Sequence, residues 1–198
     1  MLVVVDAGST DDTRTLLDKG VADGLIDLVV DGDARAGFGA NVKLAIQAAS
    51  STITPTHYWF LHDDSAPEPT TLTQLLNGAE TPDEAGRKPG IVVPKLLHPR
   101  RRNHPDQMSA VGESIAPSGA RVLTIEPGDI DQHQVGAAPV LGASTAGLLV
   151  TAGTWRTLGG FDDQIVLFRD GVDLGWRANE AGILVRTWPK ASLRHVEA

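Results

Sequence analysis

The chain has 198 residues, of which 41% are apolar, 21% charged and 5% aromatic, and its formal net charge is −8. This length and apolar fraction are typical of one folded domain with a sizeable core, and they exclude a disordered chain. An acidic balance argues against a general binder of nucleic acid or anionic membranes, because both need a basic face. The lack of cysteine excludes disulfide scaffolds, zinc–thiolate sites and thiol nucleophiles.

The first third of the chain alternates strand and helix signals. Short β-branched or aromatic runs predict strands at 2–5, 26–30 and 58–61, and helical spacing of apolar residues predicts helices at 12–22 and 37–49. Strands separated by helices of this length are typical of βαβ units in a parallel sheet. The sequence has no apolar stretch long enough to cross a membrane, and its first residues lack the basic region of a signal peptide.

The remainder of the chain is less regular. Helices are predicted at 67–76, 154–158 and 172–181, strands at 91–96, 144–150 and 183–188, and a hairpin that pairs 108–112 with 121–125. Between them, the loop at 98–107 is basic and interrupted by proline. A single α/β domain over 1–198 is the expected organisation.

Acidic residues follow two of the predicted strands. Asp6 comes directly after the first strand, and Asp63 and Asp64 come after the third. In open parallel sheets the carboxyl ends of the strands form the ligand-binding edge, so these carboxylates are expected there. A pair such as Asp63–Asp64 is typical of a Mg²⁺ or Mn²⁺ site that binds phosphates. The alternative is structural: Asp64 or Ser65 would cap the next helix.

The segment around Asp6 and the segment around Asp170 and Asp173 each have a structural and a functional interpretation. Asp6 either accepts a hydrogen bond from a nucleobase or ribose, or belongs to a turn in which Ser9 or Thr10 caps the following helix. Asp170 and Asp173 flank Gly171 at the start of a predicted helix, where the dipole favours carboxylates. One of them can also serve as a general base at the mouth of a pocket.

Taken in order, these segments resemble the family 2 glycosyltransferases of the GT-A fold. The resemblance spans the whole chain and lies in five motifs, which read VVDAGSTD at 4–11, AGFGAN at 36–41, FLHDDSAP at 60–67, GGFD at 159–162 and DGVDLGWR at 170–177, followed by a terminal Arg194–His195. It implies an α/β fold with a Rossmann-like, mostly parallel sheet flanked by helices. It also implies an inverting transferase that moves a sugar from a nucleotide-diphospho-sugar, a UDP- or dTDP-sugar, to a glycan or lipid-linked acceptor.

The resemblance assigns roles to individual residues. Asp6, Ser9, Asn41 and Asp63 are expected to contact the nucleotide. Asp63 matches the last aspartate of the family's Asp-x-Asp element, Asp64 is its acidic neighbour, and His195 matches a histidine that completes the metal site in some members. Asp63, Asp64 and His195 are therefore the expected ligands of Mg²⁺ or Mn²⁺, which would stabilise charge on the departing nucleotide.

Three departures from the family pattern bear on this interpretation. Leu61 stands at the first position of Asp-x-Asp when Asp63 is taken as the last. Gly171 stands where the family has the carboxylate that acts as the usual catalytic base. Asp170 is therefore the expected substitute, and Asp173 is the second candidate. The family also begins with a nucleotide-binding strand upstream of residue 2, so a start that is truncated, or excised from a longer enzyme, is expected.

These departures favour an alternative from a different class: a non-catalytic or degenerate GT-A module that binds nucleotide or glycan. The resemblance also implies a place in cell-envelope biosynthesis and a cytoplasmic location, at the cytoplasmic face of the membrane where the chain belongs to a longer enzyme. Membrane association is expected only through regions outside this sequence.

Overall fold

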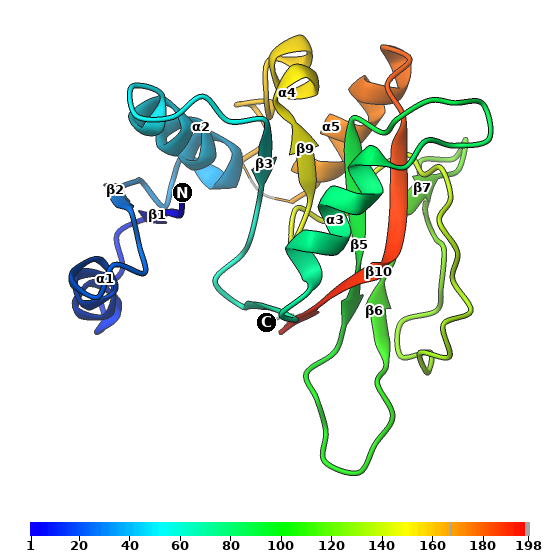
Figure 1. Ribbon diagram of the computed structural model, residues 1–198, viewed down its shortest axis with the longest axis horizontal. Coiled ribbons are helices and arrows are strands. Elements are labelled where there is room, and N and C mark those ends of the chain that lie inside the picture. Colours follow the sequence, from blue (N-terminus) through cyan, green and yellow to red (C-terminus); the bar gives the residue numbers. More distant parts are fainter. Residues whose placement is uncertain (167, 197–198) are drawn as a thin grey trace. The chain divides into compact units, whose positions relative to one another are not determined.

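A computed structural model describes residues 1–166 and 168–196. The chain divides into two compact units, each built from two stretches of sequence. Unit 1 consists of Met1–Pro55 and Gly159–Asp170, and unit 2 consists of Thr56–Leu158 and Gly171–Ala198. Figure 1 follows the chain through both units.

Unit 1 contains two βα pairs. Strands β1 (Val3–Asp6) and β2 (Leu28–Asp31) are parallel, with Asp6 opposite Asp31 at their carboxyl ends. Helix α1 (Thr13–Ala22) connects the two strands, and α2 (Gly37–Ala49) follows β2. The bounds of α2 are those that the spacing of its apolar residues predicts. Gly37 begins α2 at φ +78°, where a side chain would also overlap the backbone of Val166.

Unit 2 is built on a six-stranded sheet, in which the order β3-β9-β5-β10-β4 is extended by β6 beside β5. The strands are β3 (His57–Trp59), β4 (Ser65–Pro67), β5 (Ile91–Leu97), β6 (Met108–Ala110), β9 (Leu149–Thr151) and β10 (Val185–His195). A separate hairpin pairs β7 (Glu113–Ile115) with β8 (Arg121–Leu123). The helices are α3 (Thr71–Glu80), α4 (Ala152–Leu158) and α5 (Asp170–Glu180), of which α5 begins at the last residue of unit 1.

The α/β class is confirmed, but the main sheet is mixed rather than mostly parallel. Among its described strands only β5 and β10 run parallel, whereas the β3–β9, β9–β5, β5–β6 and β10–β4 pairs are antiparallel. The parallel expectation assumed that every strand is followed by a crossover helix. In unit 2 the long loops between β5 and β9 return the chain in the opposite direction instead (Figure 1).

Several element predictions differ from the structure. The hairpin expected between 108–112 and 121–125 is wrong, because β8 pairs with β7 and β6 pairs with β5 instead. The strand expected at 144–150 is confined to β9, and the first part of that range forms a turn. The helix expected at 67–76 begins at Thr71, and residues 65–67 form the short strand β4, which pairs with the end of β10. The strand expected at 183–188 continues to His195. It contains Pro189, and its pairing with β5 shifts register between Thr187 and Ser192, as expected for a bulge that accommodates a proline.

The core of unit 2 lies around β5, whose seven residues are all buried. Helix α3 packs on β5 and β10 (Figure 1). Leu75 of α3 is fully buried against Val92 and Leu149 of the sheet, and Trp59 and Trp188 close the edges of this cluster. Burying side chains of this size stabilises the fold by about 1.5–3 kcal/mol each.

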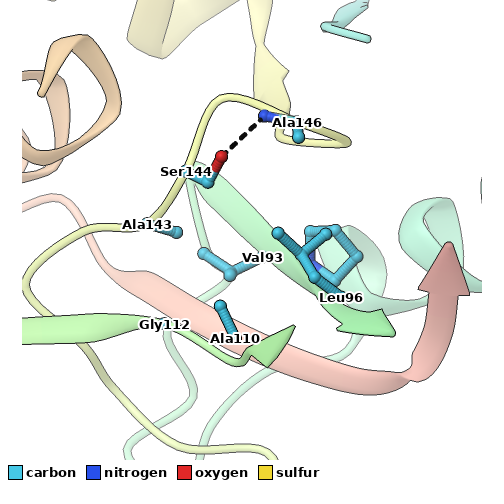
Figure 2. Close-up of a pocket in the computed structure, with 8 residues that line it drawn as sticks. Val93, Leu96, Ala110, Gly112, Ala143, Ser144 and Ala146 are labelled. Atoms are coloured by element: carbon cyan, nitrogen blue, oxygen red, sulfur yellow. Dashed lines mark hydrogen bonds between the residues drawn. The ribbon is translucent and has the colours of Figure 1, made fainter. Parts of the chain in front are cut away.

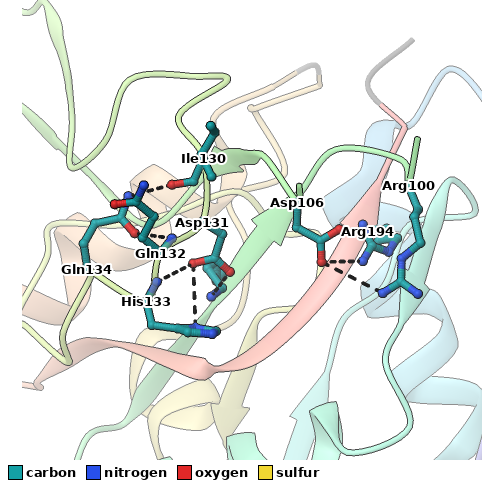
Figure 3. Close-up of polar contacts among 9 residues, drawn as sticks. Arg100, Asp106, Ile130, Asp131, Gln132, His133, Gln134 and Arg194 are labelled. Carbon is teal, nitrogen blue, oxygen red and sulfur yellow. Dashed lines mark hydrogen bonds and ion pairs between the residues drawn. The ribbon is translucent and has the colours of Figure 1, made fainter. Parts of the chain in front are cut away.

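A buried ion pair fixes the loop between β8 and β9 to this core. Lys95 in the middle of β5 donates to Asp131 Oδ2 at 2.5 Å, and the two side chains are only 5% and 8% exposed. The other oxygen of Asp131 accepts the backbone N–H of His133 at 3.1 Å (Figure 3). Burial, the largest single effect, raises the pKa of Asp131, but the hydrogen bonds and charges of Lys95 and His133 together outweigh it, so this pKa lies below its ordinary value.

Arg194 fixes the basic loop between β5 and β6. Its guanidinium lies 2.9 Å from Asp106 and 3.2 Å from Glu68, and it donates to the carbonyl oxygen of His98 at 3.1 Å. Arg100 lies 3.9 Å from Asp106, so Asp106 lies between two guanidinium groups (Figure 3). Arg194 therefore connects the base of the loop to β10, one residue before His195.

The segment between β8 and β9 passes over one face of the sheet. The turn at 143–146 passes over β5 and β6, and between them lies a small pocket (Figure 2). Its lining is mostly apolar and consists of Val93, Pro94, Leu96, Ala110, Gly112, Ala143, Ser144 and Ala146. None of the helices in the described part of the chain is long and apolar enough to span a membrane.

Candidate functional site

Three side chains of unit 2 that can each offer a metal ligand come together: His62, Asp64 and His195. His62 and Asp64 lie between β3 and β4, and His195 is the last residue of β10, opposite Ser65 in the β4–β10 ladder. Asp64 Oδ1 lies 3.0 Å from His195 Nε2 and 4.0 Å from His62 Nδ1. We call these three residues the His–Asp–His group.

The surroundings of His62 favour its neutral imidazole. The two rings meet edge to face with their centroids 5.5 Å apart. Burial lowers the pKa of His62, and the neighbouring His195 lowers it further, against the opposing effect of Asp64 and Asp63. At neutral pH His62 is therefore uncharged, which is the form in which an imidazole nitrogen binds a cation.

The composition of the group fits a divalent metal ion. Its ligand atoms, one from each residue, all lie within 4.8 Å of one another. Two imidazoles and one carboxylate form a mixed nitrogen–oxygen set that binds first-row divalent metals and leaves positions open for substrate oxygens. The residues present can therefore hold a metal ion.

Two of the three predicted metal ligands belong to this group. Asp64 and His195 are brought together from opposite ends of unit 2, whereas the side chain of Asp63 is exposed and outside the group. The alternative that Asp64 or Ser65 caps a helix is wrong, because α3 begins only at Thr71. The run that contributes to the His–Asp–His group is therefore 62–64, one position later than the 61–63 run that the sequence suggested.

The predicted nucleotide residues Asp6 and Ser9 lie in unit 1. Asp6 is buried at the end of β1, and its Oδ1 accepts the backbone N–H of Ser9 at 2.9 Å. This hydrogen bond lowers the pKa of Asp6, so its carboxylate is ionised. The capping interpretation for Ser9 and Thr10 is wrong, because Asp11 accepts the Thr13 N–H at the start of α1, at 3.1 Å.

Asn41 braces the turn that leads from β2 into α2. Its Nδ2 donates to the carbonyl oxygens of Asp33 and Gly37, at 2.8 Å each, and its Oδ1 accepts the Asp33 N–H at 3.0 Å. Both the oxygen and the nitrogen of the side-chain amide are thus hydrogen-bonded to the backbone. Asn41 shapes the loop at the carboxyl end of β2, beside the end of β1 that holds Asp6.

The two predicted base candidates differ in their surroundings. Asp173 on α5 is paired with Arg177, whose Nε and Nη2 lie 2.9 Å and 2.5 Å from the same carboxylate oxygen. This carboxylate is therefore already engaged by a charged partner on its own helix. Asp170 is buried at the first turn of α5 and belongs to unit 1, where its Oδ1 approaches Gly39 of α2.

Gly171 is required by close packing inside unit 2. A Cβ at this position would overlap the carbonyl oxygen of Ala143 and lie 3.2 Å from Thr145 Cγ2. One turn later, a Cβ at Gly175 would overlap the carbonyl oxygen of Leu141. This face of α5 therefore lies directly on the backbone at 141–143, and glycine is the residue that permits the approach.

We expect Gly171→Ala to destabilise the protein by up to about 2 kcal/mol, because overpacking against rigid backbone costs about 1–3 kcal/mol and the better helix propensity of alanine offsets about 1 kcal/mol of this. Gly153→Ala in α4 is the matched control: its Cβ has open space apart from Thr151 Oγ1 at 3.9 Å, so it should be neutral or stabilising. Urea unfolding of both variants measures the difference. A Gly171→Ala variant as stable as Gly153→Ala would contradict the packing described here.

Sequence reasoning missed His62 as a member of the metal group. The position of His62 could have indicated this role, because it follows a predicted strand and precedes two aspartates, and imidazole is a common metal ligand. It also missed Thr145, whose Oγ1 lies 2.8 Å from His62 Nε2. Nothing in the sequence around Thr145 indicates this contact, since the two residues are joined only by the fold.

The fold matches that of a solved glycosyltransferase. The structure described as GalNAc-T7 with UDP, GalNAc and Mn²⁺ superposes with a TM-score of 0.67 at 10% identity. The match covers 98% of this chain and 37% of that one, so this chain spans little more than a third of its length. At this identity the likeness shows the fold alone. No curated protein matches the chain.

The sequence itself matches the model of a protein family described as glycosyltransferase like family 2. The match runs over residues 1–198. It thus includes the strand-end carboxylates of unit 1, the His–Asp–His group of unit 2 and the glycine-packed start of α5. On this evidence the chain belongs to glycosyltransferase like family 2.

Proposed function

We propose that the chain is a metal-assisted, inverting glycosyltransferase domain that uses a nucleotide-diphospho-sugar donor and a glycan or lipid-linked acceptor. The observation that carries this proposal is the His–Asp–His group, a site fit for a divalent metal on a glycosyltransferase fold. Membership of the family supports transfer of a sugar.

Mn²⁺ is the proposed metal rather than Mg²⁺. Mg²⁺ strongly prefers oxygen ligands in octahedral geometry, whereas two of the three ligands here are imidazole nitrogens. When bound, the cation supplies Lewis-acid stabilisation of the charge that develops on the leaving nucleoside diphosphate. The GalNAc-T7 structure that shares the fold contains both Mn²⁺ and UDP.

Unit 1 is proposed to bind the nucleoside. Ligands of open α/β sheets bind at the carboxyl ends of the strands, and Asp6 stands at that end of β1. Its Oδ1 is used by the backbone of Ser9, which fixes the carboxylate while Oδ2 can accept from a ribose or base. Asn41 contributes by holding the loop after β2, as its three backbone hydrogen bonds indicate.

Asp170 is the proposed base. In the reaction the acceptor hydroxyl oxygen forms a bond to the anomeric carbon while the bond from that carbon to the diphosphate oxygen breaks. The hydroxyl proton passes to Asp170, and the electron pair leaves with the nucleoside diphosphate. A single displacement of this kind inverts the anomeric configuration. Asp173 is the weaker candidate because Arg177 already neutralises its carboxylate.

A specific observation favours a second candidate, a non-catalytic module that binds nucleotide or glycan. Position 171 has no carboxylate, and the backbone of Ala143 leaves no room for a side chain there. Such a module would keep the metal group and the donor site but transfer no sugar.

Calorimetric titration of the chain with UDP, dTDP and GDP, with and without Mn²⁺, tests the donor site. We expect one uridine or thymidine nucleotide to bind, and only in the presence of Mn²⁺. Incubation with the corresponding UDP- or dTDP-sugar then distinguishes the two candidates, since slow hydrolysis of the donor to nucleoside diphosphate indicates an active centre. Lack of binding by every nucleotide, with and without metal, would contradict the transferase and the nucleotide-binding form of the module.

A further inference from the structure

We propose that Thr145 is a positioning residue for the metal group, because it holds the His62 ring so that Nδ1 faces the cation. The inference rests on the proposed function in one respect, that the His–Asp–His group binds a metal. Thr145 is 7% exposed, and its Oγ1 lies 2.8 Å from His62 Nε2. The opposite nitrogen, Nδ1, lies 4.0 Å from Asp64 Oδ1.

The direction of this hydrogen bond decides whether His62 can be a ligand. A neutral imidazole carries its proton on one nitrogen and a lone pair on the other. When Nε2–H donates to Thr145 Oγ1, the lone pair lies on Nδ1, the nitrogen that faces Asp64. Metal-binding histidines usually donate their second nitrogen to a polar group in this manner, which fixes both the tautomer and the ring orientation.

The turn that carries Thr145 is rigidly connected to both ligand-bearing segments. Phe60, two residues before His62, donates to the carbonyl oxygen of Leu148 at 2.9 Å and accepts the Gly147 N–H at 2.8 Å. Gly147 has φ +83°, and a Cβ there would overlap the side chain of Leu193, two residues before His195.

The turn is also braced within itself. Ser144 Oγ accepts the N–H of Ala146 at 3.2 Å (Figure 2). With the ties to Phe60 and Leu193, this contact fixes the position of the Thr145 hydroxyl relative to the strand ends that present His62 and His195. Thr145 is thereby suited to orient a ligand rather than to adapt to one.

Two substitutions separate positioning from packing. Thr145→Val has nearly the same shape but no hydroxyl, so the His62 ring loses its partner on Nε2. Thr145→Ser keeps the hydroxyl and should restore the wild-type behaviour. Thr154→Val in α4 removes a different buried hydroxyl, whose partner is Thr151 at 2.9 Å, and is the control for a general loss of a buried polar group.

Mn²⁺ affinity of the full chain, measured by electron paramagnetic resonance titration, is the main readout. We expect Thr145→Val to bind Mn²⁺ about 10–100-fold more weakly than wild type, the usual cost of losing such a partner. Thr145→Ser should bind within about threefold of wild type, and Thr154→Val should be unchanged. Circular dichroism melts of the metal-free chains check that each variant folds. Unchanged affinity of folded Thr145→Val, or equal losses in Thr145→Val and Thr145→Ser, would overturn the proposal.

The tautomer of His62 gives a second readout that needs no metal. Nitrogen-15 chemical shifts of the metal-free protein should show the proton on Nε2 in wild type and a changed tautomer distribution in Thr145→Val. A wild-type chain that does not bind Mn²⁺ would overturn the proposed function. The tautomer of His62 would then still test whether Thr145 orients the ring. A proton on Nδ1 of wild-type His62 would overturn the positioning role whatever the metal result.

Discussion

Replacing Asp64 with alanine is expected to reduce both Mn²⁺ affinity and donor turnover by more than about 100-fold, because losing only the partner of a ligand already costs about 10–100-fold. Asp64 supplies the single carboxylate of the metal group and lies 3.0 Å from His195 Nε2. Its removal leaves two imidazoles without a negative charge to balance a divalent cation. Calorimetric titration with Mn²⁺, followed by turnover of the donor sugar nucleotide, measures both effects.

Asp63→Ala is the matched control for this experiment. It removes the same chemical group from the neighbouring residue, whose side chain is exposed and outside the His–Asp–His group. We expect its Mn²⁺ affinity to stay within about threefold of wild type, since solvent-exposed charges contribute little, about 0–1 kcal/mol. The reverse outcome, with Asp63→Ala losing the metal and Asp64→Ala keeping it, would show that the 61–63 run of the sequence interpretation contributes the ligand.

Removing the acid from the buried Lys95–Asp131 pair is expected to produce the largest loss of stability. Asp131→Asn keeps the shape of the side chain but leaves the ammonium of Lys95, 5% exposed, without a counter-charge. Breaking a buried ion pair from one side costs about 3–5 kcal/mol, because the remaining charge is uncompensated. We expect a decrease of about 3 kcal/mol in the free energy of unfolding, measured by urea denaturation at pH 7.

The double variant Lys95→Met/Asp131→Leu distinguishes lost pairing from lost packing. Replacing both charges with apolar groups of similar volume is often neutral or stabilising, so the double variant should be more stable than Asp131→Asn. A double variant that loses as much as the two single changes together would mean that the charges do not interact.

The same pair gives a pH dependence of known sign. The pKa of Asp131 is lower in the folded chain than its ordinary 3.8, so the unfolded chain takes up a proton first as the pH falls. The stabilisation by Asp131 is therefore complete above pH 3.8 and is lost as the pH falls through the lower folded value. Acid unfolding should accordingly be steeper for wild type than for Asp131→Asn.

Elements with a strong local pattern were predictable from the sequence, whereas those defined by a partner were not. Helix α2 has the predicted bounds, because its apolar residues repeat with helical period. Strand β5 ends one residue later than predicted, and its β-branched start at 91–93 is the local signal that indicated a strand. The three residues of β4 include a proline, and only pairing with β10 makes them a strand. The extension of β10 beyond Pro189 depends in the same way on its neighbour β5.

The candidate site was predictable to the extent that strand ends and family motifs indicate it. Asp64 and His195 were expected to be neighbours, and the fold brings them together. His62 and Thr145 were missed because their importance comes from a contact between residues far apart in sequence, 2.8 Å across the fold. The steric role of Gly171 was also hidden, since a glycine in a sequence does not reveal which backbone it lies against.

The position of His195 at the very end of β10 has a thermodynamic consequence. In the described sheet β4 pairs with β10 alone, through three residues. A cation bound by His62, Asp64 and His195 joins chain positions separated by almost the whole of unit 2, and so acts as a reversible cross-link. The three ligands are brought together only in the folded chain, so the cation binds that state and stabilises it against unfolding. The free energy of unfolding would then increase with metal concentration by RT ln(1 + [L]/Kd), where [L] is the concentration of free metal and Kd its dissociation constant. Metal concentration would thus control stability as well as the occupancy of the proposed catalytic site.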